Sequence, residues 1–290
     1  MSTGHANGAI NTRTVLYGVF GDPVAQSRSP LMLNRAFAVT GINAAYAAFH
    51  VTPNKLQEAV AGIRALGFRG VNVTIPHKVE VMDYLDVIDD SARMIGAVNT
   101  IVNDGGQLTG YNTDGVGYLR SLKEETGFEP AEKCILVLGA GGAARGIVHS
   151  LVNEGAREII VANRTRSRAE ELAASIDHSR ILRGIGTEGI SMLPEPIDLI
   201  INTTQAGMAP LLEQTPFDVR LIQPHMLISD IVYNPRETLL MKEAKARGAA
   251  VHGGLGMFVH QGAYAFELWT GLPAPVAAML QIVEQALADG

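Results

Sequence analysis

The stretch that most constrains the fold is Cys134–Gly146, where a glycine-rich turn separates a run of apolar residues from a helical pattern. Its first five residues are apolar without interruption, which is typical of a strand buried on both faces of a parallel sheet. Gly139, Gly141 and Ala144 then fit the spacing G-x-G-x-x-[G/A]. The stretch therefore predicts a strand, a tight turn and a helix in immediate succession.

This spacing has a chemical reason. The first glycine permits the turn, the second lets the backbone approach a pyrophosphate, and the third position lets helix and strand pack closely. The unpaired N–H groups at the start of the helix then face the anion. A second apolar run, Glu158–Asn163, follows at the distance expected for the next parallel strand. The sequence predicts dinucleotide binding; the alternative is a glycine-rich turn with a purely structural role.

The end of the second run indicates which dinucleotide binds. NAD sites usually carry Asp or Glu at this point, for the ribose hydroxyls. Here the segment 163–168 has no carboxylate and contains Arg164, Arg166 and Arg168. A guanidinium forms paired hydrogen bonds with a phosphate, which a carboxylate would repel. We therefore predict NADP(H); the alternative is a solvated basic loop, in which Ser167 and Glu170 form a capping box for the next helix.

Composition narrows the classes of function. The chain has 290 residues with 47% hydrophobic and 18% charged, which suits two globular domains. A net charge of −6 argues against a broad nucleic-acid surface. One cysteine and scattered histidines give no metal-ligand spacing, so we predict no metal. The polar residues 1–13 predict a flexible tail and lack a signal peptide's apolar core; with no membrane span, the expected location is cytoplasmic.

The N-terminal half alternates expected strands and helices, which predicts a second α/β domain with a mainly parallel sheet. Between its first strand and first helix lie Ser27 and Ser29. Ser29, followed by Pro30, is a good helix N-cap, which leaves Ser27 without a structural reason. Two hydroxyls beside a helix start form a suitable site for a small carboxylate.

Lys78 is the first candidate for catalysis. It follows the expected strand 70–75, in the first turn of a short helix expected to end near Leu85. A cation there opposes the helix dipole, so a purely structural residue would more naturally be acidic. Catalysis by Lys78 and a surface pair with Glu80 are both compatible with this position. The polar cluster 112–117 supplies a second candidate, Asp114, which could also cap a helix.

Eight segments occur in a fixed order along the chain: Ser27-Arg-Ser-Pro, Asn72-Val-Thr-Ile-Pro-His-Lys, Gly96-Ala-Val-Asn-Thr, Asn112-Thr-Asp-Gly-Val-Gly, Gly139-Ala-Gly-Gly-Ala, Asn163-Arg-Thr-x-x-Arg, Tyr233-Asn-Pro, and Gly253-Gly-Leu-Gly-Met leading to Gln261. Together they resemble the shikimate dehydrogenase family over nearly the whole chain, from Tyr17 to Leu287.

The resemblance implies reversible NADPH-dependent reduction of 3-dehydroshikimate to shikimate, in aromatic amino acid biosynthesis. It implies an α/β substrate domain (14–114 and 252–290), a Rossmann-like NADP domain (115–251) and an active-site cleft between them. It assigns Lys78 and Asp114 to catalysis as an acid/base pair. The implied substrate-binding residues are Ser27, Ser29, Thr74, Lys78, Asn99, Asp114 and Gln261. The cofactor residues are Gly139, Ala140, Gly141, Gly142, Ala143, Asn163, Arg164, Thr165, Arg168, Ile231, Tyr233 and Gly254.

Two alternatives stay open at this point. A quinate/shikimate dehydrogenase would accept quinate or use NAD, and such enzymes tend to have an acidic residue where this chain has arginines. A catalytically silent protein would bind NADP or shikimate without turnover, although Lys78 and Asp114 argue against it. The expected partner is the small-molecule substrate, with no nucleic acid and no membrane. The sequence leaves the oligomeric state open, a homodimer included.

Overall fold

The computed structural model describes residues 10–176, 181–193 and 196–289. Two compact units divide the chain: Met1–Thr113 with Gly262–Gly290, and Asp114–Gln261. Asp114 and the segment 252–261 thus belong to the second unit, whereas the sequence expectation placed them in the first. Most of the expected tail, residues 1–9, lies outside the described residues.

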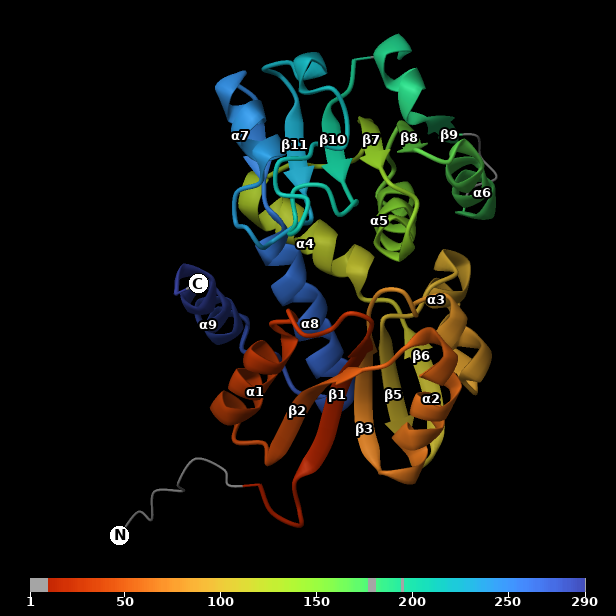
Figure 1. Cartoon of the computed structure of the whole chain (residues 1–290), viewed down its shortest axis with the longest axis vertical. Helices are drawn as coiled ribbons and strands as arrows, with labels where there is room; N and C mark the ends of the chain where they lie inside the picture. Colours follow the sequence, from red (N-terminus) through yellow and green to blue (C-terminus); the bar gives the residue numbers. More distant parts are fainter. Residues whose placement is uncertain (1–9, 177–180, 194–195, 290) are drawn as a thin grey trace. The chain divides into compact units, whose positions relative to one another are not determined.

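The first unit contains a six-stranded mixed sheet in the order β2-β1-β3-β5-β6-β4 (Figure 1). β1 pairs in parallel with β2 and β3, whereas β5 runs antiparallel to β3 and β6. Its elements are β1 (Val15–Gly21), α1 (Ser29–Thr40), β2 (Ala44–His50), α2 (Leu56–Ala65), β3 (Phe68–Val73), β4 (Val87–Ile88), α3 (Asp90–Ile95), β5 (Thr100–Asp104), β6 (Gln107–Tyr111), the C-terminal part of α8 (Gly254–Thr270) and α9 (Val276–Ala288).

The C-terminal segment completes the core of this first unit. The Trp269 ring packs 5.1 Å from the ring of Tyr17, and its indole N–H donates to the Ile101 carbonyl at 2.9 Å. Gly70 of β3 lies under the same indole, where an added Cβ would stand only 2.1 Å from Nε1. A larger residue at position 70 would displace Trp269, so glycine is required here by packing.

The second unit contains a six-stranded sheet in the order β12-β11-β10-β7-β8-β9, with every pairing parallel. This is the strand order of the Rossmann fold, which confirms the predicted fold class. Its elements are α4 (Asp114–Thr126), β7 (Cys134–Leu138), α5 (Gly142–Asn153), β8 (Glu158–Asn163), α6 (Arg166–Ile176), β9 (Leu182–Gly186), β10 (Leu199–Asn202), β11 (Leu227–Asp230), α7 (Leu239–Ala246), β12 (Ala250–His252) and the N-terminal part of α8.

Successive residues of these buried strands face opposite layers. Leu227 of β11 joins the cluster formed with α4 and α5, and Ile228 joins the cluster formed with α7. The alternation continues with Ser229, which contacts α4, and Asp230, which contacts the start of α7. Adjacent residues of β11 therefore bring polar groups to opposite faces of the sheet.

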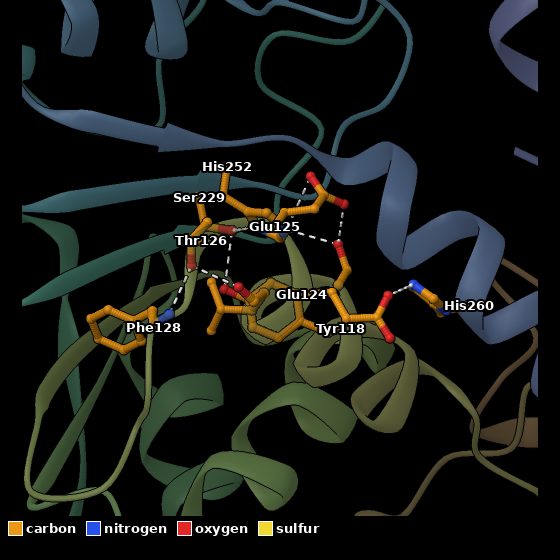
Figure 2. Close-up of polar contacts among 10 residues, drawn as sticks. Tyr118, Glu124, Glu125, Thr126, Phe128, Ser229, His252 and His260 are labelled. Carbon is orange, nitrogen blue, oxygen red and sulfur yellow. Dashed lines mark hydrogen bonds and ion pairs between the residues drawn. The ribbon is translucent and has the colours of Figure 1, made fainter. Parts of the chain in front are cut away.

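Figure 2 shows the polar chain on the α4 face. The Tyr118 hydroxyl donates to Ser229 Oγ at 3.0 Å, and Ser229 Oγ lies 2.9 Å from His252 Nδ1. His252 Nε2 lies 2.8 Å from Ser121 Oγ, which donates to Glu125 Oε1 at 2.9 Å. Burial lowers the pKa of His252 to about 4, so the ring is neutral at pH 7. A neutral ring protonated on Nε2 satisfies the whole chain of donors and acceptors.

Candidate functional site

The two glycines of the β7–α5 turn serve different purposes. Gly139 has a φ of +107°, and an added Cβ would stand 2.6 Å from Thr203 Oγ1, so the turn itself requires glycine. Gly141 has a φ of −87°, and an added Cβ would meet no described atom within 4 Å. Neither backbone conformation nor packing explains Gly141. The open space above it is what a pyrophosphate needs at the start of α5.

The arginine segment follows β8, which lies next to β7 in the sheet. Arg166 begins α6 and pairs with Glu170 at 2.7 Å. The expected capping box is therefore wrong, because Ser167 lies inside the helix and Glu170 binds a guanidinium instead. Arg164 and Arg168 are exposed, and within the described part of the chain neither has an ion pair. Two guanidinium groups thus remain available to a phosphate beside the glycine turn.

Three further expected cofactor residues meet where β11 and β12 end. Gly254 begins α8 against Ile231, since an added Cβ would lie 2.1 Å from the Ile231 carbonyl oxygen. The Tyr233 ring stacks on Phe258 of α8 with centroids 4.3 Å apart. In a parallel sheet, ligands bind beyond the carboxyl ends of the strands, which is where these residues and the glycine turn lie.

In the first unit, Thr74, Lys78 and Asn99 come together at one edge of the sheet. The Thr74 N–H donates to the Phe20 carbonyl at 2.9 Å, and the Val73 N–H donates to the Asn99 carbonyl at 2.8 Å. The Lys78 carbonyl accepts from Val98 N–H at 2.7 Å. The first bond joins the residue after β3 to β1, and the other two join the end of β3 and the turn after it to the segment that leads into β5.

Lys78 does not lie in a helix, contrary to the sequence expectation. It belongs to a turn, and only a short 3-10 helix follows, over Glu80–Tyr84. The helix-dipole argument for Lys78 was therefore wrong. Its place at the polar edge of the sheet is what now supports a functional role.

Ser27 and Ser29 lie at the start of α1. Ser27 Oγ accepts from the Ser29 N–H at 3.3 Å. The helix begins at Ser29 and its N-cap position is Arg28, so the expectation that Ser29 caps the helix was wrong. Ser29 is buried close to Tyr46; burial raises the pKa of the Tyr46 hydroxyl well above its usual range, and Ser29 lowers that pKa in part. The two serines therefore lie together at the start of α1, with Ser29 next to Tyr46 of β2.

Comparison with known proteins gives the same organisation along the chain. Residues 19–101 match the shikimate dehydrogenase substrate binding domain, residues 122–241 match shikimate / quinate 5-dehydrogenase, and residues 254–284 match the shikimate 5'-dehydrogenase C-terminal domain. The shikimate dehydrogenase (NADP(+)) of Geobacillus kaustophilus is 52% identical over 272 residues, which cover 94% of this chain and 98% of that protein. The chain belongs to the shikimate dehydrogenase family.

Solved structures of related proteins extend this comparison. A crystal structure of a shikimate dehydrogenase in complex with NADP+ superposes with a TM-score of 0.91 at 40% identity, covering 98% of this chain and 99% of the other. A quinate dehydrogenase of Corynebacterium glutamicum in complex with NAD has a TM-score of 0.86 at 32% identity, covering 94% and 99%. The shikimate dehydrogenase fold is thus shared by proteins with different substrates and cofactors.

Sequence reasoning missed a buried hydrogen-bonded network in the first unit, which includes Asn99. The Tyr46 hydroxyl donates to Asn72 Oδ1 at 2.7 Å, and Asn72 Nδ2 donates to Thr100 Oγ1 at 3.1 Å. Thr100 then donates to Asn99 Oδ1 at 3.0 Å, and Asn99 Nδ2 donates to Thr113 Oγ1 at 3.0 Å. The available signal was a polar residue, Asn72, between the apolar residues Val71 and Val73 of β3.

Asp114 and Gln261 belong to the second unit of the chain. Asp114 is buried and is the first residue of α4, whereas Gln261 lies on α8. The two helices touch at Gly117, where an added Cβ would stand 2.6 Å from the Gln261 backbone nitrogen. This close approach fixes the spacing between the two predicted substrate residues.

Across the described ranges, no helix is both long enough and apolar enough to cross a membrane.

Proposed function

We propose that the chain catalyses the reversible NADPH-dependent reduction of 3-dehydroshikimate to shikimate, in the biosynthesis of aromatic amino acids. The observation that carries this proposal is the open turn at Gly141 beside the exposed Arg164 and Arg168, in a chain 52% identical to an NADP-dependent shikimate dehydrogenase. NADP is the cofactor named for that relative, and the two exposed guanidinium groups of this chain suit the 2′-phosphate of NADP.

The proposed substrate-binding residues belong mainly to the first unit, and Asp114 and Gln261 come from the second. Ser27 and Ser29 bind the substrate carboxylate, since paired hydroxyls at the start of a long helix suit an anion. Thr74, Asn99 and Gln261 bind the ring hydroxyls, because hydroxyl and amide groups both donate and accept. Residues 163–165 and 168, the turn 139–143, and Ile231, Tyr233 and Gly254 hold the cofactor.

Lys78 and Asp114 form the proposed acid/base pair. NADP(H), when bound, exchanges a hydride with C3 of the substrate. In the reductive direction the C3 oxygen also gains a proton, which the Lys78 ammonium group donates; in the oxidative direction Lys78 accepts that proton. Asp114, buried at the start of α4, orients the lysine and the substrate hydroxyl. General acid/base catalysis of this kind contributes about 10²–10⁴ in rate.

The test is the absorbance of reduced nicotinamide after mixing the protein with shikimate and NADP+, shikimate and NAD+, quinate and NADP+, and quinate and NAD+. We expect rapid turnover only with shikimate and NADP+. Comparable turnover with quinate or NAD+ would instead support the second candidate, a quinate/shikimate dehydrogenase, which the similarity to an NAD-bound quinate dehydrogenase favours. NADP binding without turnover of any pair would indicate a catalytically silent binding protein.

The proposed assembly is a homodimer formed through the free edge of β2. This strand has the sequence AAYAAFH, without Pro or an acidic residue, Lys or Arg, and such edges pair readily. The Asn34 side chain already bonds both the Tyr46 N–H and carbonyl, so pairing would use Ala47–His50. Light scattering after size exclusion should give twice the chain mass; a monomer mass at micromolar concentration would exclude it.

The cytoplasm is the proposed location. The single cysteine, Cys134, is buried and free, which suits a reducing compartment. Fractionation of cells that express the tagged chain should recover the activity with cytoplasmic marker enzymes, and recovery with the membranes would refute this location.

A further inference from the structure

A buried carboxylate, that of Asp230, lies at the end of β11, between the loops that follow β10 and β11. Asp230 has no exposed surface. Its Oδ1 accepts from Asn202 Nδ2 and from the Val232 N–H, each at 3.0 Å. Its Oδ2 accepts from Thr238 Oγ1 at 2.7 Å. A carboxylate only accepts hydrogen bonds, so all three donors must point toward Asp230.

Through Asn202, the carboxylate fixes the loop that follows β10. Asn202 Nδ2 also donates to the Ala206 carbonyl at 3.1 Å, while its Oδ1 accepts from the Thr204 N–H at 3.0 Å and Thr204 Oγ1 at 2.7 Å. The neighbouring Thr203 packs against Gly139 of the glycine turn. The position of this loop is therefore tied both to Asp230 and to the turn after β7.

On its other side, the carboxylate fixes the loop that follows β11. The Ile231 N–H donates to the Asn202 carbonyl at 3.1 Å, and Val232 is held by Asp230 itself. Gly254 packs against the Ile231 carbonyl, so the start of α8 follows this loop. Thr238 is the N-cap of α7 and accepts from the Met241 N–H. One side chain thus sets the separation of two strand ends and the start of a helix.

A purely stabilising role would be served better by a neutral residue. Burial raises the pKa of Asp230 to about 6, although the hydrogen bonds from Thr238, Val232 and Asn202 lower it in part. The ionised form present above that pH is therefore energetically unfavourable in the folded state. Charged groups retained at such a cost concentrate at functional sites.

We propose that Asp230 is a positioning residue for the nicotinamide half of NADP(H). It acts through the loops after β10 and β11 and does not itself contact the cofactor. The proposal rests on the proposed function, in which Ile231, Tyr233 and Gly254 hold the cofactor; we assign these three residues, which follow β11 and β12, to its nicotinamide half. The adenosine half, by contrast, is assigned to the glycine turn and to Arg164, on the other side of the strand-order reversal between β7 and β10.

The test compares binding of NADP+ with binding of 2′,5′-ADP, which carries the adenosine half and its phosphate but no nicotinamide. Calorimetry at pH 8 would be run on the wild type, on Asp230→Ala and on Asp230→Asn. We expect Asp230→Ala to lower NADP+ affinity about ten- to a hundredfold, because it leaves buried donors unpaired, and to leave 2′,5′-ADP affinity within about twofold. Asp230→Asn keeps one accepting oxygen and should recover most of the loss.

Ser229→Ala is the matched control. Ser229 precedes Asp230 in β11 and is equally buried, but its side chain bonds Tyr118 and His252 on the opposite face of the sheet (Figure 2). The Ser229→Ala variant loses these bonds, so it should be less stable than the wild type but should bind NADP+ and 2′,5′-ADP with nearly wild-type affinity. If Asp230→Ala does not fold, Thr238→Val replaces it, since this nearly isosteric change removes the donor to Oδ2, together with the N-cap acceptor for the Met241 N–H.

Three results would overturn the proposal. Equal losses for NADP+ and 2′,5′-ADP would show a general structural effect. A loss in Ser229→Ala as large as in the Asp230 or Thr238 variant would show that any buried polar deletion has this effect. Unchanged NADP+ affinity would show that the loops do not depend on Asp230. If the wild type binds NADP+ but does not oxidise shikimate, the proposed function is refuted. The comparison of NADP+ with 2′,5′-ADP would still test the role of Asp230, because it measures binding and not turnover.

Discussion

The two units each place a buried polar network behind the edge of a sheet, and the two networks are built from different chemistry. In the first unit the network consists of neutral hydroxyl and amide groups, from Tyr46 to Thr113. In the second unit it centres on the carboxylate of Asp230. A hydroxyl both donates and accepts, so the first network can rearrange its hydrogens, whereas every donor around Asp230 has a fixed direction.

This difference corresponds to two ways of building a binding edge. In the first unit, Asn99 belongs to the network and is also a proposed substrate ligand. In the second unit, the network holds backbone loops, and other residues are the proposed cofactor ligands. Substitutions among the substrate ligands of the first unit should therefore change catalysis, whereas substitutions around Asp230 in the second unit should change the position of the loops that hold the cofactor.

The largest effect is expected from Lys78→Ala at the first edge. Loss of a positioned acid/base should lower kcat by about 10²–10⁴, with little change in the KM for NADP+, since Lys78 belongs to the substrate unit. Steady-state kinetics with both substrates varied would measure this. Lys55→Ala, which removes an exposed lysine of the same unit, is the control. An almost unchanged kcat would remove Lys78 from the acid/base role.

The second effect is a pH dependence of stability that only the charged network should show. The pKa of Asp230 is about 6 in the folded state, against 3.8 in the unfolded reference, so between these values the folded state binds more protons. The free energy of unfolding should therefore fall as pH rises from about 4 to 6, by about 3 kcal/mol from this residue.

Chemical denaturation of wild type and Asp230→Asn across this pH range isolates the contribution, because other titrating groups are common to both proteins. The difference between the two curves should grow from pH 4 to pH 6 and then level off. Parallel curves would mean that Asp230 keeps the same proton affinity in the folded and unfolded states.

A third prediction concerns the arginine segment. Arg164→Ala should weaken NADP+ binding about ten- to a hundredfold, because it removes a charge-assisted contact worth about 1.5–3 kcal/mol. Arg166→Ala should have little effect, since Glu170 already pairs with that guanidinium. Titration of both variants with NADP+ and with NAD+ tests the assignment. An equal loss for both cofactors would place Arg164 away from the 2′-phosphate.

The smallest effect is expected from Tyr118→Phe. It removes one hydroxyl from the α4 face of the second sheet, where Ser229 still keeps His252 as a partner. Net loss of one buried hydrogen bond should lower the free energy of unfolding by about 0.5–1.5 kcal/mol. NADP+ affinity, measured by the same titration, should not change. A clear decrease would contradict the inference that only the Asp230 face of β11 affects cofactor binding.

The parts of the fold predicted from sequence are those with a strong local pattern. β7, its turn and β8 lie as expected because an unbroken apolar run beside a glycine turn has few other solutions. β9 was missed, since Leu182–Gly186 is a short edge strand with two glycines and an arginine. The short helix predicted to contain Lys78 begins only at Glu80 and is a 3-10 helix, because so short a pattern fixes neither where a helix starts nor its type.

The candidate site was predicted unevenly for a related reason. Motif positions such as Thr74 and Gly141 could be found from their neighbours in sequence. The bond from Tyr46 to Asn72 spans 26 residues, and the bond from Asn202 to Asp230 spans 28, so no local pattern reveals either. Asp230 also resembles an ordinary acidic residue at the solvent end of a strand, and only its burial distinguishes it.

Gly139 and Gly141 have opposite consequences for how the sequence can vary. At Gly139 any side chain must adopt a left-handed backbone and meet Thr203, so a substitution would fail in the folding of the chain itself. At Gly141 a side chain meets open space in an ordinary extended backbone, so the fold would tolerate almost any residue. A library randomised at position 141 alone should therefore yield well-folded proteins graded in cofactor affinity, a route by which this turn can change its ligand without first losing its structure.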